Sequence, residues 1–136
     1  MKKIVCIALA VLLAGTATWA QETGKKINKT NLVIKEWNTD ANSKARTLDH
    51  VTTYNANGKK IEEIEYNSEG QKWRKRYEYD ASGKVSVESV YDERNRLDNY
   101  KKFEYNEFGR KKIQYTYTAK GKLKTVKVYE YIAEDA

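Results

Sequence analysis

The sequence predicts an all-β protein, an antiparallel meander of about eight strands that forms one strongly twisted, partly open sheet. A tyrosine-ended turn motif recurs between residues 54 and 121, and each copy can close a β-hairpin. The segments between these turns are seven to nine residues long and rich in Val, Ile, Tyr, Thr and Phe, which favour strands. None of them sustains the apolar spacing of three and four residues that a long helix requires.

The first residues of the chain differ in composition from the rest. Lys2 and Lys3 provide positive charge, residues 4–15 form an apolar run, and residues 16–20 are small apart from one tryptophan. This order is typical of a cleavable secretory signal. The apolar run is shorter than the roughly 20 residues that a transmembrane helix needs.

We therefore expect cleavage after Ala20, with residues 1–20 as signal peptide and residues 21–136 as a single β-repeat domain. The predicted destination is the periplasm, the cell surface or the medium, with no stable membrane span after cleavage. The remaining chain has neither cysteine nor proline, and its 24 basic and 19 acidic residues give a net charge of +5. Because the two signs are interleaved, the sequence lacks the one-signed basic stripe of a nucleic-acid-binding face.

The turn motif reads Tyr-Asn/Asp-x-x-Gly-Lys/Arg and occurs in six copies, one of which has Asn95 in place of glycine. Asn or Asp can open a type I turn, and the glycine then accepts a left-handed conformation as the bulged residue of the hairpin loop. We expect positive φ at Asn95 and at five glycines: Gly58, Gly70, Gly83, Gly109 and Gly121. The eight strands are expected near residues 29–37, 47–54, 59–66, 71–79, 84–91, 96–105, 110–117 and 122–131.

The turn type also predicts the register, because side chains alternate between the two faces of a strand. Tyr79 should face Val85, and by the same rule Tyr91 should face Leu97 and Tyr117 should face Leu123. Ten of the eleven tyrosines then share one face, and Tyr100 lies on the other. The tyrosine face should also carry Trp73, Phe103, Ile64, Ile113, Val85 and Val87. The opposite face should pair Arg76 with Glu88, Glu104 with Lys112 and Arg110 with Glu130.

One spacing between turn tyrosines is irregular. Successive turn tyrosines are 12, 13, 12, 14 and 12 residues apart, and the odd interval from Tyr66 to Tyr79 would reverse the face. A β-bulge near Lys72 would restore it. The bulge should place Trp73 beside Tyr66, and it should pair Glu65 with Arg74 and Glu63 with Arg76.

The sequence leaves two ways to arrange the sheet, a closed up-and-down barrel and an open curved sheet. Eight strands suit a barrel whose interior side chains can fill. Polar residues expected at mid-strand on the tyrosine face oppose closure, because unpaired buried charge is costly. They are Glu62, Lys75, Asn99, Lys101 and Lys127. We therefore favour the open sheet.

The Tyr-Asp-x-x-Gly spacing, as in Tyr79-Asp80-x-x-Gly83, resembles the YD (Rhs) repeats of large surface proteins, and the likeness covers residues 54–131. Members of that family form long β-spirals and shells and have been linked to carbohydrate binding, so the resemblance implies a β-repeat. This chain is far too short to form a shell. The size, signal and Tyr-Asn repeats also look like a family of small exported proteins of Bacteroides-type bacteria with no assigned activity.

Catalytic and metal-binding constellations are lacking in the sequence. His50 is the only histidine and no cysteine remains after residue 20, which argues against metal clusters and against Cys–His or Ser–His nucleophile pairs. Glu62 and Glu63 are adjacent in a predicted strand and so point to opposite faces. We expect no catalytic residue, no metal and no cofactor.

Two classes of function remain. The first is a non-catalytic binding module that holds a glycan or an extended peptide or protein on its aromatic face, with Trp73, Tyr77, Lys75 and Lys101 as ligand-binding residues. The second is a structural or self-assembling envelope or surface protein, whose aromatic face or free edges pair with another copy, giving a homo-oligomer, or with a partner.

Overall fold

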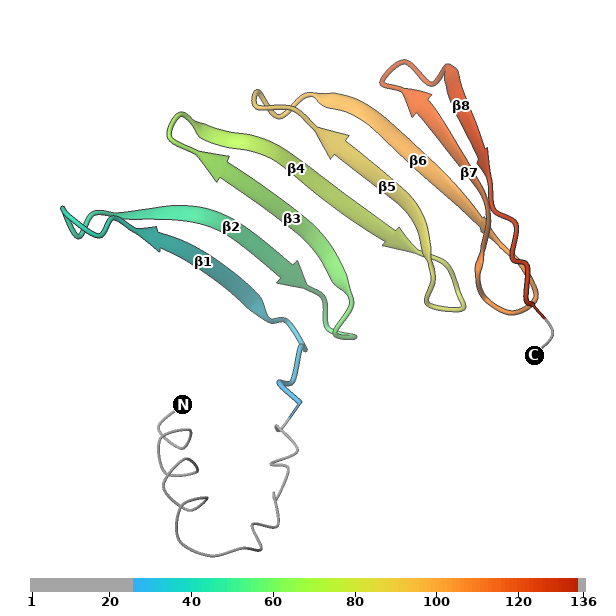
Figure 1. The fold of residues 1–136 in the computed structure, drawn as a ribbon, viewed down its shortest axis with the longest axis horizontal. Helices are drawn as coiled ribbons and strands as arrows, with labels where there is room; N and C mark the ends of the chain where they lie inside the picture. Colours follow the sequence, from blue (N-terminus) through green and yellow to red (C-terminus); the bar gives the residue numbers. More distant parts are fainter. Residues whose placement is uncertain (1–25, 135–136) are drawn as a thin grey trace, which may run out of the picture.

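The computed structural model describes residues 26–134, and they form one sheet of eight antiparallel strands in sequence order (Figure 1). The strands are β1 (Val33–Thr39), β2 (Arg46–Tyr54), β3 (Lys60–Asn67), β4 (Gly70–Tyr79), β5 (Val85–Tyr91), β6 (Leu97–Tyr105), β7 (Lys111–Thr118) and β8 (Leu123–Val128). The all-β meander is confirmed. The predicted signal peptide and its cleavage site lie outside the described residues.

The sheet is open, as the mid-strand charges indicated. Among the described strands, β1 pairs only with β2 and β8 only with β7, so the closed barrel considered as an alternative does not form. Figure 1 shows β1 and β8 at opposite ends of a twisted, curved sheet. Both end strands are shorter than expected, because β1 begins at Val33 and β8 stops at Val128.

The turns have the predicted chemistry. All five glycines of the motif have positive φ, as does Asn95 at 62°. In the β4–β5 turn, Asp80 Oδ1 accepts hydrogen bonds from the N–H groups of Ser82 and Lys84 at 2.9 and 3.0 Å. The Gly83 N–H donates to the Asp80 carbonyl at 3.0 Å. The side chain that opens the turn therefore satisfies the backbone donors that the loop leaves unpaired.

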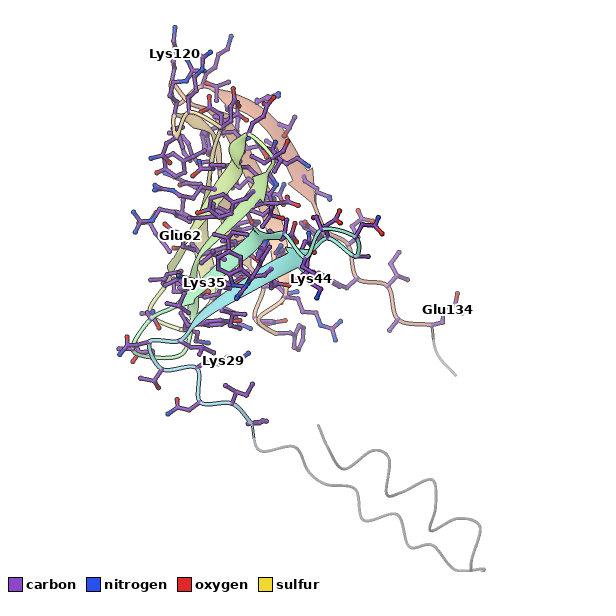
Figure 2. All side chains as sticks on the ribbon, turned by 90° about the vertical axis from the view of Figure 1, so that its left-hand side faces the viewer. Lys29, Lys35, Lys44, Glu62, Lys120 and Glu134 are labelled. Carbon is purple, nitrogen blue, oxygen red and sulfur yellow. The ribbon has the colours of Figure 1, made fainter. Side chains whose placement is uncertain are left out.

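The described residues form a single layer without a buried apolar core. Thr52, at 8% exposure, is the one buried residue among them. Side chains project from both faces, and no second layer of the described chain covers either (Figure 2). The residues of β3 to β7 are largely half-buried, whereas every residue of β1 and β8 is exposed. Burial in this sheet therefore comes from neighbouring strands.

A β-bulge recurs in every pair of neighbouring strands. Tyr79 lies opposite Val85 and Glu78 opposite Val87, so Ser86 has no partner. The predicted pairs Tyr91–Leu97 and Tyr117–Leu123 are likewise confirmed, each with a bulge beside it. The residues skipped in the seven pairs are Asp49, Ile61, Lys72, Ser86, Asp98, Lys112 and Lys124.

The bulges overturn the prediction that ten tyrosines share a face. Each one reverses the alternation once, so the turn tyrosines alternate between faces along the sheet. We call the face with Trp73 and Lys75 the front face, and the face with Arg74 the rear face. By register, the front face carries Tyr54, Tyr77, Tyr79 and Tyr105, and the rear face carries Tyr66, Tyr91, Tyr100, Tyr115 and Tyr117.

The predicted bulge at Lys72 is present, but the pairing built on it is wrong. Tyr66 lies opposite Gln71, and Glu65 lies opposite Trp73 rather than Arg74. The spacing of 13 residues has another cause, a shorter loop in which Asn67 pairs with Gly70. Because this loop is one residue shorter than the other loops of the motif, the interval between Tyr66 and Tyr79 is odd. The bulge is not the cause, since every hairpin has one.

The predicted charge pairs fail for the same reason. Arg76 lies opposite Ser89 and Glu62, not opposite Glu88 or Glu63. Lys112 is a bulged residue, and Glu104 therefore lies opposite Ile113. Arg110 and Glu130 lie outside strands β7 and β8. The ion pairs that form instead, such as Arg74 and Arg76 with Glu62, follow the shifted register, with N···O distances of 3.8 and 3.9 Å.

Candidate binding surface

The four residues singled out by the sequence lie on the front face. Trp73, Lys75 and Tyr77 alternate along β4, so the three side chains project to the same side. Lys101 reaches this face from β6, because Glu88 of β5 lies opposite both Tyr77 and Lys101. The structure therefore places all four on one surface formed by the interior strands.

Trp73 is flanked by a basic and an imidazole side chain. The Lys75 ammonium lies 4.9 Å from the centre of its indole ring. The His50 ring approaches edge-on, with centroids 5.9 Å apart at 75°. A cation over an aromatic face contributes roughly 0.5–1 kcal/mol at exposed sites. These contacts orient the indole, which lies on a strand whose backbone is already paired on both sides.

A hydrogen-bonded cluster surrounds the carboxylate of Glu63. The Tyr77 hydroxyl donates to Glu63 Oε2, and Lys60 Nζ lies 3.2 Å from the same oxygen. His50 Nε2 lies 3.6 Å from Oε1. The Lys60 ammonium also lies 5.1 Å from the centre of the Tyr77 ring. The Glu63 side chain is only 19% exposed, so three elements, β2, β3 and β4, fix its position.

The cluster holds defined protonation states. Burial, followed by the hydrogen bond to Glu63 and the negative charges of Glu63 and Glu88, raises the pKa of Tyr77 far above its ordinary value. Burial alone would raise the pKa of Glu63, but hydrogen bonds from Tyr77 and Lys60 outweigh it and lower that pKa below 4.5. At neutral pH the phenol is therefore a donor and the carboxylate is ionised.

The second charged pair of the front face joins β5 to β6. Lys101 Nζ lies 3.6 Å from Glu88 Oε1, and these side chains are 32% and 17% exposed. The ammonium therefore lies in the outer part of the layer, within reach of a molecule placed over the face. Together, the indole, the phenol, two carboxylates and three ammonium groups form a fixed pattern of donors and acceptors. Such a pattern can bind a polar ligand, and it contains no activated nucleophile.

Sequence reasoning missed Glu63, Lys60, His50 and Glu88 as parts of this surface. Glu63 was assigned to the opposite face because the count along β3 did not include the bulge at Ile61. Glu88 was misplaced by the bulge at Ser86 in the same way. Both bulged residues lie seven residues after a turn tyrosine, a constant distance that could have located the bulges. A cross-strand partner for the Tyr77 hydroxyl could have suggested Glu63.

The rear face has a different character. The Arg74 guanidinium lies 4.5 Å from the centre of the Tyr91 ring, and its Nε is buried without a hydrogen-bond partner. Tyr100 and Tyr117 stack in parallel at 4.9 Å. A shallow hollow of about 310 Å³ adjoins this face beside Arg76 and Tyr91. On the rear face, an arginine thus covers the Tyr91 ring, and the Tyr100 and Tyr117 rings cover each other.

Residues 26–134 contain no group of three or more His, Cys, Asp or Glu side chains suited to a metal ion. In the same part of the chain, no helix is long and apolar enough to cross a membrane.

Comparison with known proteins identifies no family for this chain. No family model matches the chain, and no curated protein matches it. One solved structure, the GtfA/B complex bound to UDP and GlcNAc, is similar over 70% of this chain and 20% of that one, with 15% identity and a TM-score of 0.31. The present chain thus spans about a fifth of that protein's chain. The likeness is too low to carry an argument about fold or function.

Proposed function

We propose that the protein is a non-catalytic exported binding module that holds a glycan on its front face, with Trp73, Lys75, Tyr77 and Lys101 as contact residues. The observation that carries the proposal is a sheet face that no other part of residues 26–134 covers (Figure 2), on which an indole and a phenol lie among fixed charges. Aromatic rings supply a large contact area at low entropic cost, and a few polar groups orient the ligand.

The dimensions of the surface suit a chain of sugar rings. Neighbouring strands are about 4.8 Å apart, so Tyr77 of β4 and Lys101 of β6 are separated by about 10 Å along the cross-strand row through Glu88. Two successive sugar rings cover a similar length. The carboxylates of Glu63 and Glu88 accept hydrogen bonds, while the lysines and the Tyr77 hydroxyl donate them.

An extended peptide is the second ligand class for this surface. Peptides that add a strand to a sheet need free backbone N–H and C=O groups. In β4 and β5 these groups already pair with both neighbours. A peptide on the front face would therefore rely on side-chain contacts alone, which makes the glycan the better match.

The alternative class, a structural or self-assembling surface protein, is favoured by the exposed apolar side chains of the two edge strands. These residues lie outside the front-face surface, so the two functions use different parts of the sheet.

The test is a glycan array on the exported protein, followed by fluorescence titration with any glycan retained. Changing Trp37 to phenylalanine makes Trp73 the one tryptophan in the described residues. We expect Trp73→Ala to abolish retention and Lys75→Ala and Lys101→Ala each to weaken it, while unfolding free energies of the lysine variants change by less than about 1 kcal/mol.

A matched control is Lys102→Ala. Lys102 is the neighbour of Lys101 in β6 but lies on the rear face, 5.6 Å from the Tyr117 ring centre. Its removal should leave glycan retention unchanged. Retention that survives Trp73→Ala, or that falls equally with Lys102→Ala, would place the ligand elsewhere.

A further inference from the structure

The exposed large apolar side chains that lie within the described strands all belong to the two end strands. On β1 they are Val33, Ile34 and Trp37, with exposures of 50%, 37% and 42%; on β8 they are Leu123, Val126 and Val128, with exposures of 47%, 49% and 65%. Their counterparts on the interior strands are half-buried by strands on both sides. Within residues 26–134, each end strand has a neighbouring strand on one side only.

Five of these six side chains share the rear face; Ile34, opposite Thr52, lies on the front face. Val126 lies opposite Tyr115 and Leu123 opposite Tyr117, so both are on the rear face of the sheet, as is Val128. On β1, Trp37 lies opposite Leu48, which places it on the rear face with Val33. Both free edges therefore present their apolar stripe on the same side of the sheet.

The direction of the strands also matches. In a meander with an even number of strands, the first and last strands run in opposite directions. A second copy placed beside the first would bring its β1 next to β8 as an antiparallel neighbour, the same relation that joins every pair within the chain. The two edges have similar lengths, seven residues in β1 and six in β8.

We propose that copies of this protein associate head to tail, with β8 of one copy pairing antiparallel with β1 of the next. The junction continues the meander and joins the rear-face apolar stripes of the two copies. The free backbone groups of both edges become hydrogen-bonded, and the side chains of each edge gain the missing neighbour.

One register satisfies both faces of the junction. With Lys127 opposite Glu36 of the next copy, opposite charges meet on the front face. The same register places Val126 opposite Trp37, an aromatic and β-branched pair on the rear face. Lysines on exposed edges usually discourage pairing; here the carboxylate of Glu36 makes pairing selective for this edge and this direction.

The junction joins two different surfaces, so it does not close on itself as a two-fold dimer does. Each added copy covers one free edge and presents a new one of the same kind, so the assembly always ends in one free β1 and one free β8. The mass of the assembly should therefore increase continuously with protein concentration.

The first test is charge reversal, read by light scattering across a range of concentrations. The variants are expressed from the full coding sequence and purified from the exported fraction. Glu36→Lys and Lys127→Glu should each reduce association at least tenfold, because like charges then meet at the junction. Mixing the two variants should restore association, since every junction again joins one lysine with one glutamate.

Glu107→Lys and Lys120→Glu are the matched controls, because they make the same charge changes on exposed turns. They should associate like the unchanged protein. A monomer at all concentrations, or a mixture no better associated than its components, would overturn the proposal.

The second test is disulfide trapping of the register, in a Cys6→Ser background so that the introduced cysteines are the only ones. A mixture of Trp37→Cys and Val126→Cys proteins should form a disulfide-linked dimer under mild oxidation, while each variant alone should not. Thr125→Cys, on the front face, should not link to Trp37→Cys. Efficient linkage of Val126→Cys to itself would show a two-fold edge contact and refute the head-to-tail arrangement.

Discussion

The interior strands and the end strands of this sheet have the same kinds of residue but very different surroundings. Tyr79 and Tyr131 make the same hydrogen bond, from the phenol to a backbone carbonyl of the preceding hairpin, at 2.5 and 2.7 Å. Tyr79 is half-buried between strands, whereas Tyr131 is 48% exposed. In a single layer, the neighbouring strands provide the burial that a second layer provides elsewhere, so position along the sheet determines how much each contact contributes.

The largest expected effect comes from the turn glycines. Gly83 has a φ of 83° in the interior β4–β5 turn, and an alanine there is strained by about 1–2 kcal/mol. We expect Gly83→Ala to lower the free energy of unfolding by that amount in urea denaturation. Gly83→Asn should cost less, because Asn95 already adopts a similar conformation in this protein.

The end of the sheet should respond differently to the same change. Gly121 has a φ of 85° in the turn before β8. The strain of Gly121→Ala can be relieved by detaching β8 alone, so global stability should fall by less than about 1 kcal/mol while hydrogen exchange in β8 accelerates. If both alanine variants lose the same free energy of unfolding, the sheet unfolds as a unit. That result would contradict the difference between interior and end strands.

The next largest loss of stability should come from removing the hydroxyl of Tyr79, with Tyr131 as the comparison. Tyr79→Phe should cost about 1 kcal/mol, because it leaves the half-buried Lys60 carbonyl without its donor. Tyr131→Phe removes the same bond where water can replace it, so it should cost a few tenths of a kcal/mol. The measurement is equilibrium unfolding, and a larger loss at Tyr131 would contradict the account of burial.

The smallest effect is the pH dependence of the Glu63 cluster. The folded protein holds the Glu63 pKa below 4.5, so this contribution is present above pH 4.5 and is lost as pH falls through the lowered folded value. We expect less than about 1 kcal/mol for this partly exposed group. The raised pKa of Tyr77 has the opposite sign, and its contribution is lost as pH rises above 10.

Glu63→Gln should reduce the acidic loss, and Tyr77→Phe should reduce the alkaline one, in urea denaturation followed across pH. Part of each limb should remain, because hydrogen bonds also lower the pKa of Asp80 and burial also raises the pKa of Tyr79. Glu107→Gln, on an exposed turn, is the control and should leave both limbs unchanged. An acidic limb of unchanged size in Glu63→Gln would show that Glu63 contributes nothing to it and would contradict the prediction.

The turns could be predicted from the sequence because their chemistry is local. An Asn or Asp side chain and a glycine three residues later specify the loop within five residues. The bulges were not predicted, although the skipped residues Ile61, Ser86, Asp98 and Lys112 each lie seven residues after a turn tyrosine. These four residues have no chemistry in common, so the signal is the constant distance from the turn and not the type of residue.

The four residues of the candidate site were predicted correctly to share a face, whereas the full set of residues on each face was not. Trp73, Lys75 and Tyr77 share a strand, so their common face does not depend on any bulge between strands. Lys101 was placed correctly because the bulges at Ser86 and Asp98 each reverse the face, and the two reversals cancel between β4 and β6. Glu63 and Glu88 are separated from Tyr77 by one strand boundary each, where a single reversal is not compensated.

The most direct test of the account is thiol labelling on the two faces of one interior strand, since the described residues contain no cysteine. Val90 and Ser89 are half-buried neighbours on β5, on the front and rear faces respectively. For a single open layer, Val90→Cys and Ser89→Cys should react with a charged thiol reagent at rates within about tenfold of each other. The rates are measured on the folded protein, at urea concentrations well below those that unfold it. Protection of one position by a hundredfold or more would show a covered face and contradict the single-layer structure on which the binding surface depends.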